Sequence, residues 1–226
     1  MDILNATRHF EFVLTGVAPM IMHQDNLEFQ EAIAAWRKDP ENKKYSVPGD
    51  DRSPAWTWIG CPYHDGERCG VSQDNVMTCL RNAGAKILVP TGKHGQTFKG
   101  MTQLIIIDQI LLPVTVDGNP VPWKPIEKLI GVMDFEKHKE VAEKLGFKLF
   151  VKRAPVNKNA KHIRVRPKFN TWTVTGSFMV SEDLLTTEVL KQIFTYAGNY
   201  IGLCDWRPGA KTPGPFGRFT SELKQV

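Results

Sequence analysis

The sequence lacks any apolar run of roughly 18 residues or more, the length at which a membrane-spanning helix becomes a candidate. It also lacks internal repeats and low-complexity tracts. The first residues, MDILNATRHF, contain no basic region followed by an apolar stretch, so we expect no secretory signal. With 42% hydrophobic and 23% charged residues, the composition predicts one globular domain over residues 1–226, located in the cytoplasm.

Cysteine is scarce, and its positions exclude a dense disulfide framework. The four residues Cys61, Cys69, Cys79 and Cys204 favour reduced thiols. Cys61, His64 and Cys69 are ligand types that suit zinc, but their spacing matches no strong zinc motif. We therefore predict no metal and no cofactor, while the sequence leaves zinc binding by these three residues open.

Two patterns of nucleotide or metal chemistry are also missing. Residues 92–95, GKHG, lack the spacing of a phosphate-binding P-loop. The acids Asp50, Asp51, Asp65 and Glu67 lie in a predicted loop with no following lysine motif. Their context favours surface acids over the metal cluster of a nuclease.

Positive charge is present and concentrated. The net charge is +5, yet residues 148–168, KLFVKRAPVNKNAKHIRVRPK, contain eight Lys or Arg and no acid. The rest of the chain therefore carries a net charge of −3. Such a local strip is typical of a phosphate-binding surface. The alternative is an ordinary solvated basic loop.

Apolar periodicity predicts an α+β protein. Phe10, Phe12 and Leu14 alternate with Glu11, Val13 and Thr15 in a half-buried strand over 9–17. Ser72 can cap a helix over 72–84. The other expected elements are a short helix near 27–37, strands within 104–116, a charged helix at 135–145, strands at 147–153 and 163–167, an alternating strand at 171–180 with Trp172 in the core, and an amphipathic helix at 187–201.

Two strand–helix units predict a ferredoxin-like (RRM-like) antiparallel sheet, a fold common among RNA-binding modules. Residues 24–70 are weakly patterned and rich in Asp, Pro, Gly and Trp, which predicts a large insertion within the single domain. Trp56 and Trp58 lie two residues apart on an apparently extended segment, so they would face the same side. They would form either a stacking platform or an interface patch.

A glycine-rich loop follows the last predicted helix. Residues 198–219, GNYIGLCDWRPGAKTPGPFGRF, combine five glycines with cations and with the aromatic rings of Trp206 and Phe216. Glycine lets the backbone approach a ligand, cations bind phosphates, and rings stack on bases. The loop is therefore a candidate clamp for a nucleotide chain.

These features resemble the RAMP superfamily, the ferredoxin-fold proteins of CRISPR effector complexes. The resemblance rests on the glycine loop with Gly202, Arg207, Gly214 and Gly217, on VSQDNVMTCLRNAGAKI at 71–87 with its pair Leu80-Arg81, and on FVLTGVAPMIMH at 12–23. The family implies a loop that contacts RNA, a homo-oligomer or filament along the strand, and an insertion that builds subunit interfaces. The whole chain also resembles uncharacterised proteins of tailed phages, which would place it in the host cytoplasm.

The resemblance is weaker for catalysis. Asp25 lies near the position of the cleaving aspartate of type III RAMP subunits, but its surroundings do not match. His23 is a weak catalytic candidate, because the sequence pairs it with no second acid–base group.

We therefore expect sequence-tolerant binding of single-stranded nucleic acid, with RNA favoured over DNA, without cleavage. The alternatives are a metal-independent endoribonuclease using His23 or His162 and a structural phage assembly protein. The predicted binding residues are Arg81, Lys93, Lys99, Lys152, Arg153, Lys158, Lys161, His162, Arg164, Arg166, Trp206, Arg207, Lys211, Phe216 and Arg218.

Overall fold

The computed structural model describes residues 7–90, 94–157 and 160–226. Its strands are β1 (Arg8–Gly16), β2 (Met20–Ile21), β3 (Tyr63–His64), β4 (Cys69–Ser72), β5 (Ile105–Ile107), β6 (Leu111–Val116), β7 (Asn119–Pro120), β8 (Lys148–Asn157), β9 (Ala160–Phe169), β10 (Thr173–Val180) and β11 (Phe219–Gln225). Its α-helices are α1 (Leu27–Lys38), α2 (Gln73–Gly84), α3 (Lys124–Glu127), α4 (Phe135–Lys144) and α5 (Thr187–Tyr196).

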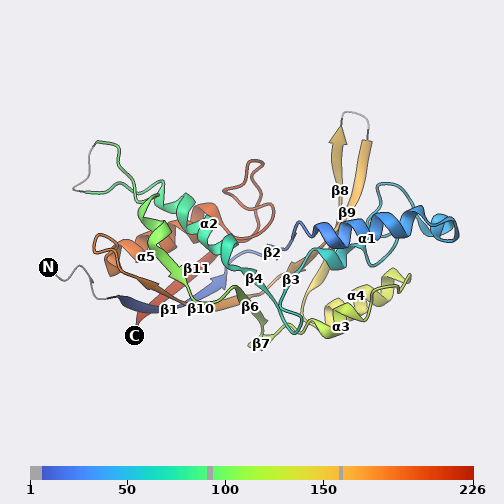
Figure 1. Ribbon diagram of the computed structural model, residues 1–226, viewed down its shortest axis with the longest axis horizontal. Coiled ribbons are helices and arrows are strands. Elements are labelled where there is room, and N and C mark those ends of the chain that lie inside the picture. The colour runs from blue at the N-terminus through green and yellow to red at the C-terminus, as the bar shows by residue number, and fades with distance from the viewer. Residues whose placement is uncertain (1–6, 91–93, 158–159) are drawn as a thin grey trace.

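The chain forms an elongated molecule with two lobes (Figure 1). The first lobe is an antiparallel sheet in the order β11-β1-β10-β6-β4-β3, with β5 beside β10 and β7 beside β6. Helices α2 and α5 lie against one face of this sheet (Figure 1). The predicted α+β class with a large antiparallel sheet is therefore confirmed.

The core between the sheet and the helices follows the predicted alternation. Phe10, Phe12 and Leu14 of β1 are fully buried, and the ring of Phe12 lies 5.7 Å from that of Phe194 on α5. On α2, the Ser72 hydroxyl accepts a hydrogen bond from the Asn75 N–H, as its predicted role as N-cap requires. Periodic burial against one layer thus fixes both elements.

The last helix ends earlier than the apolar pattern predicts. α5 stops at Tyr196, and residues 197–201 form a wider π-helical turn in which the Gly202 N–H donates to the Ala197 carbonyl. A side chain at Gly198 would meet the backbone of β11, its Cβ lying 2.0 Å from the Phe219 carbonyl oxygen. Glycine at this position lets β11 pass directly against the end of the helix.

The second lobe is built from residues far apart in the chain. β2, β9 and β8 form a separate three-stranded sheet, with α1 near β9 and α3 and α4 beneath it (Figure 1). Residues 24–70, the predicted insertion, supply α1 to this lobe, but their C-terminal part leads into β4 of the main sheet. A second excursion, between β6 and β10, supplies α3, α4 and the β8–β9 hairpin.

The interpretation of two tryptophans as a surface platform or patch is wrong. Trp56 is 5% exposed and Trp58 is 0% exposed. Residues 57–60 form a short 3-10 helix rather than an extended segment, so the two rings do not share an exposed side. Trp56 packs between Phe29 and Trp36 of α1, and the Trp58 indole donates to Nδ1 of His138 at 3.0 Å. Trp172, by contrast, is buried as predicted.

A membrane-crossing helix is not found in the described ranges, where no helix is both long and apolar enough.

Candidate nucleic-acid interface

The β8–β9 hairpin separates the basic strip into two faces. Phe150 pairs with Arg166, Lys152 with Arg164, and Ala154 with His162 across the two strands. Because cross-strand partners share a face and successive residues alternate, these six residues lie on one side. We call this side the groove face of the hairpin. Arg153, which is exposed, therefore lies on the opposite face, as does Lys161.

A buried aspartate organises the two arginines of the groove face. The backbone at Asp50 and Asp51 runs along the free edge of β9, where the Asp51 N–H donates to the Ile163 carbonyl. The Asp51 carboxylate accepts hydrogen bonds from Arg164 at 3.0 Å and from Arg166 at 3.1 Å. It also accepts one from the Val165 N–H at 3.2 Å.

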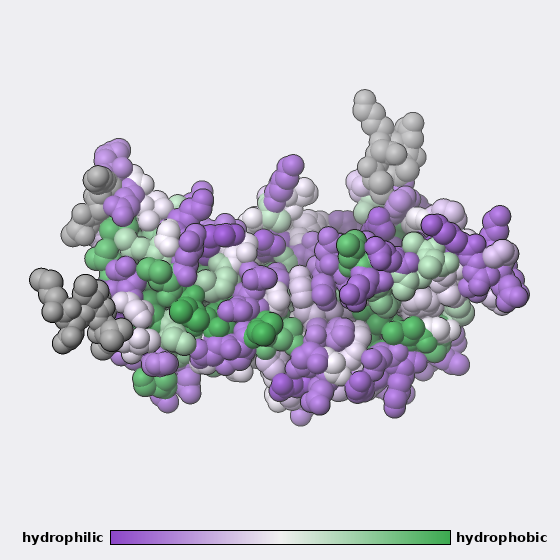
Figure 2. Space-filling view, in the orientation of Figure 1, coloured by the Kyte–Doolittle hydropathy of each residue, from purple (hydrophilic) through white to green (hydrophobic). Residues whose placement is uncertain are grey.

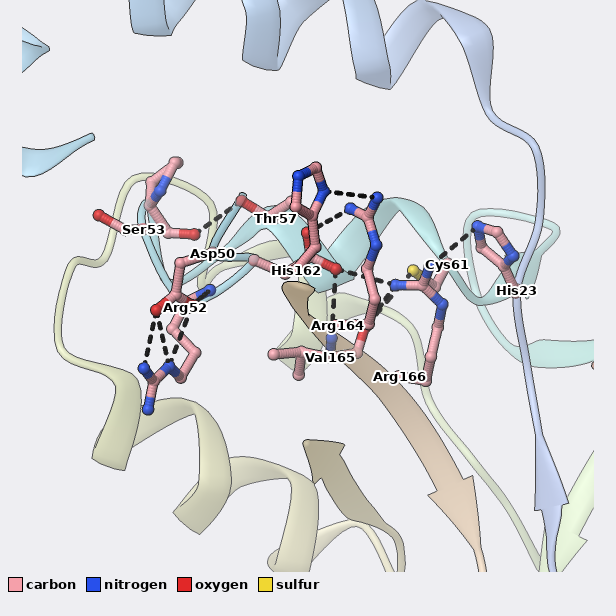
Figure 3. Close-up of polar contacts among 12 residues, drawn as sticks. His23, Asp50, Arg52, Ser53, Thr57, Cys61, His162, Arg164, Val165 and Arg166 are labelled. Atoms are coloured by element: carbon pink, nitrogen blue, oxygen red, sulfur yellow. Dashed lines mark hydrogen bonds and ion pairs between the residues drawn. The ribbon is translucent and has the colours of Figure 1, made fainter. Parts of the chain in front are cut away.

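The expectation that Asp51 is a surface acid is therefore wrong. Its side chain is only 7% exposed, and its partners come from a strand more than a hundred residues later. Fixing both guanidinium groups in this way reduces the entropy that each would lose on binding an anion. Figure 3 shows the two arginines side by side, with His162 next to Arg164 and His23 next to Arg166.

His23 has neighbours that the sequence did not indicate. Its Nε2 lies 3.3 Å from the Arg166 guanidinium and its Nδ1 lies 3.9 Å from the Asp205 carboxylate. Asp205 reaches this place because its N–H donates to the Ile21 carbonyl of β2. Burial and the Arg166 charge lower the pKa of His23 below its usual value. A neutral imidazole that accepts from Arg166 is the form that fits these contacts.

Aromatic rings from the glycine-rich loop stand opposite the hairpin. The Lys152 ammonium lies over the Trp206 ring, 3.0 Å from its centre. The Trp206 ring lies 5.3 Å from that of Phe216, which lies 5.7 Å from that of Phe150. Gly214 permits this packing, because a Cβ there would lie 2.1 Å from the Trp206 ring. The loop and the hairpin thus meet through three rings and a cation.

Two cavities flank the arginines. The loop-side cavity, of about 510 Å³, lies between the hairpin and the glycine-rich loop and is lined by Lys152, Trp206 and Lys211. The helix-side cavity, of about 460 Å³, lies between the hairpin and α1. Both include His23, Arg164 and Arg166 in their walls. These three residues therefore form a ridge between two hollows, and the surface dips between loop and hairpin in Figure 2.

The predicted binding residues fall into several groups. Those that line the loop-side cavity are Lys152, Arg164, Arg166, Trp206 and Lys211, with Phe216 behind Trp206 and His162 beside Arg164. Those placed away from both cavities are Arg81 on α2, Lys99 before β5, Arg153 and Lys161 on the opposite hairpin face, and Arg218 before β11. Lys93 and Lys158 lie outside the described residues.

Arg207 points away from the ridge. Its guanidinium donates to the Cys204 carbonyl at 2.6 Å, and it lines neither cavity. The turn that it holds is strained, since Cys204 and Trp206 both have positive φ angles, of 60° and 47°. The geometry favours Arg207 as a structural pin of the loop, and its predicted ligand contact stays a prediction.

The candidate zinc ligands have other contacts. The ring of His64 stacks on Trp123 at 3.6 Å, while the Cys61 thiol lies under the ridge near the Val165 carbonyl. Burial raises the pKa of Cys61 to about 11 and that of Cys69 to about 12, so both thiols are protonated at neutral pH. Within the described ranges, no group of three or more His, Cys, Asp or Glu side chains gathers as a metal site.

Sequence reasoning missed three residues of this interface: Asp51, Phe150 and Asp205. Phe150 carried a usable signal, because it alternates with Lys152 in a strand-like segment. The two aspartates carried none, since each reaches the site through a long-range backbone pairing.

Compared with models of known protein families and with curated protein sequences, the chain has no match. The function is therefore argued from the geometry of the site.

Proposed function

We propose that this protein binds single-stranded nucleic acid, RNA in preference to DNA, along the loop-side cavity and across the arginine ridge. The observation that carries the proposal is the convergence of cations and aromatic rings from the hairpin and the glycine-rich loop on one cavity. Backbone phosphates would contact Lys152, Arg164, Arg166 and Lys211, while bases would stack on the Trp206 side. Contacts to phosphates and ring faces tolerate any sequence.

The charge balance supports a polyanion as ligand. Four cations line the loop-side cavity with one carboxylate, that of Asp205, and the buried Asp51 lies behind the ridge. The site therefore keeps a net charge of about +2 with His23 neutral. An isolated surface strip would be screened by salt, but guanidinium groups held by a buried carboxylate are already oriented.

The strand order supports a ferredoxin-like core of the kind found in RAMP proteins. β1, α2, β6, β10, α5 and β11 follow one another in the chain, and the sheet order is β11-β1-β10-β6. This is the arrangement expected of a βαββαβ unit. Assembly of several copies along one strand is part of the same proposal.

The open face of the main sheet is less suited to the ligand. RRM modules stack bases on aromatic residues of that face. Here β1 and β11 place Glu11 and Glu222 on the side away from the helices, and the described open-face positions of β1, β10 and β11 include no Phe, Tyr or Trp. The proposal therefore places RNA on the second lobe.

The test uses a fluorescently labelled oligouridine and the matching oligodeoxythymidine, with anisotropy measured over a range of salt concentrations. About three to four phosphate contacts should give a log–log slope between roughly −2 and −3. A flat salt response would contradict an electrostatic groove. Analytical ultracentrifugation with longer strands would report whether several copies load on one strand.

The hairpin itself supplies a matched pair of variants. Lys152→Ala removes a cation from the groove face and its contact with Trp206, and we expect roughly tenfold weaker binding. Arg153→Ala removes the same charge one residue later, on the opposite face, and should change binding less than about threefold. Equal losses in the two variants would mean that the basic strip acts only through its total charge.

A further inference from the structure

The helix-side cavity is not needed by the backbone path just described, and its lining differs from that of the loop side. Phe29, Ile33 and Ala34 of α1 form one wall, opposite the ridge. The ring of Phe29 packs directly against the backbone of residue 60 because that residue is glycine. A Cβ there would lie 2.4 Å from the phenyl ring. The cavity therefore has an apolar side that reaches from α1 to the short helix at 57–60.

Amide groups stand at the mouth of the same cavity. Gln24, Asn26 and Gln30 all line it. The side chain of Asn26 caps α1 through the Phe29 N–H, and Gln30 donates to Asp25. The side-chain amide of Gln24 makes no hydrogen bond with the described part of the chain and keeps both its donors and its acceptor available.

The size and charge of the helix-side cavity indicate which kind of molecule it can hold. A volume of about 460 Å³ lies within the ~300–1,000 Å³ range of pockets that enclose one small organic molecule. One wall carries the two guanidinium groups of the ridge, which suit a phosphate, with the Asp51 carboxylate that holds them. The wall on the α1 side offers apolar side chains and amides, together with the cation Arg37. A nucleotide has this same division between an anionic end and a flat heterocycle.

The geometry points to the helix-side cavity as a pocket for a single nucleobase of the bound strand, whose phosphate rests on Arg164 and Arg166. The base leaves the stack on the loop side, crosses the ridge and lies against Phe29 and Ile33, with its polar edge toward Gln24. This inference rests on the proposed function, because it needs a strand on the ridge. It adds one base-accepting site per protein to a surface that otherwise contacts the phosphates of the strand and the flat faces of its bases.

A plug in the cavity tests the inference. Ala34 lines the cavity from an exposed position on α1, so Ala34→Trp fills the space without entering the core. Ala32 is also exposed, lies roughly 200° around the helix from Ala34, and does not line the cavity. Ala32→Trp is therefore the matched control. If the Trp variant at residue 34 melts at a lower temperature than its control, Ala34→Leu replaces it.

Two probes separate a base pocket from a phosphate site: an oligodeoxythymidine and an abasic strand of the same length and charge. Ala34→Trp should weaken binding of the oligodeoxythymidine by roughly tenfold, within the range for one stacked base, and leave binding of the abasic strand unchanged. Ala32→Trp should change neither. Equal weakening of both strands, or no weakening of either, would overturn the base pocket.

The outcome also separates this inference from the proposed function. Lys152→Ala should weaken binding of both strands, since it removes a phosphate contact. If Lys152→Ala weakens both strands and Ala34→Trp weakens neither, the base pocket is wrong and the groove stands. If neither these two strands nor the oligouridine binds the unmodified protein, the proposed function fails, and the base pocket fails with it.

Discussion

The two faces of the β8–β9 hairpin both carry cations, but these cations differ in how they are held. On the groove face, Arg164 and Arg166 are held by the buried carboxylate of Asp51, and Lys152 lies over Trp206. On the opposite face, Arg153 has no such anchoring partner among the described residues. Charge alone therefore does not define a binding surface. A cation becomes part of a site when neighbouring groups fix its position before the ligand arrives.

The part of the opposite face that lies nearest the body of the protein packs into the core. Val165 and Phe169 are buried there, and the ring of Phe169 lies 5.1 Å from that of Phe147. Phe147 in turn lies 6.0 Å from Trp58, whose indole donates to His138. One face of the hairpin is thus organised by a buried charge and the other by an aromatic core.

The largest effect is expected from Asp51→Ala. The substitution leaves two guanidinium groups and the Val165 N–H without their shared acceptor. We expect the free energy of unfolding to fall by about 2–4 kcal/mol, the range for breaking a buried charged network, measured by urea denaturation.

The neighbouring aspartate is the control for this prediction. Asp50 pairs with Arg52, whose side chain is 44% exposed, so Asp50→Ala should cost about 1 kcal/mol or less. Equal costs at the two positions would show that Asp51 does not organise the groove face.

Acid should destabilise the aromatic core that packs behind the opposite face of the hairpin. Burial lowers the pKa of His138, whose Nδ1 accepts from Trp58 and whose Nε2 donates to the Val132 carbonyl. Because the folded-state pKa is lowered, the unfolded chain binds the proton more readily. The stability that neutral His138 contributes to the folded protein is therefore fully present above about pH 6.5. As the pH falls below that value, the free energy of unfolding decreases by up to about 1.4 kcal/mol per pH unit.

The measurement is the melting temperature from about pH 8 to about pH 5. His138→Gln should melt lower than the parent at neutral pH but show a shallower decline in acid. His23 and His64, whose pKa values are also lowered by burial, account for the slope that remains. A parent protein whose melting temperature is constant over this range would contradict the prediction.

A smaller effect is expected from Arg207→Ala. Its one hydrogen bond to the Cys204 carbonyl pins the turn that carries Trp206, so we expect a loss of about 1 kcal/mol in stability. Binding of the oligouridine should weaken only as far as the folded fraction decreases. A variant that melts like the parent but binds at least tenfold more weakly would restore the ligand contact that the sequence predicts.

The smallest effect is expected at His23. Its Nε2 is occupied by Arg166 and its Nδ1 faces Asp205 at 3.9 Å, and the proposed function includes no cleavage. A labelled RNA incubated with excess protein should therefore stay intact, with or without divalent metal ions, and His23→Ala should look the same. Cleavage that is lost in His23→Ala would instead support the endoribonuclease alternative, with Asp205 orienting the imidazole.

The structure was predicted best where apolar residues repeat with a helical or strand period and pack against one layer. The strand at Phe10–Leu14, the helix that begins after Ser72 and the buried Trp172 follow from local patterns that the core enforces. The prediction for Trp56 and Trp58 was wrong because a 3-10 turn, rather than a strand, turns Trp56 toward α1 and Trp58 toward His138 of α4. Their period of two was not sustained long enough to distinguish these structures.

The candidate site was predictable only in part. The acid-free basic strip indicated a phosphate surface, but the prediction included both Lys152 and Arg153, which the hairpin places on opposite faces. Which side faces the glycine-rich loop depends on the register of the hairpin and on its packing, which local patterns do not set. The position of Asp51 in the site depends on its contacts with residues 163–166, and no local sequence pattern predicts pairing over such a separation.

The pairing of β1 with β10 and β11 also orders events during synthesis. β1 leaves the ribosome long before either of its neighbours exists, so Phe10 and Phe12 have no partner strand until β10 has been translated. The ridge arginines emerge earlier than Trp206 and Lys211, which complete the loop-side cavity. A nascent chain that has emerged only as far as residue 169 therefore carries the basic hairpin but not the Trp206 side of the loop-side cavity.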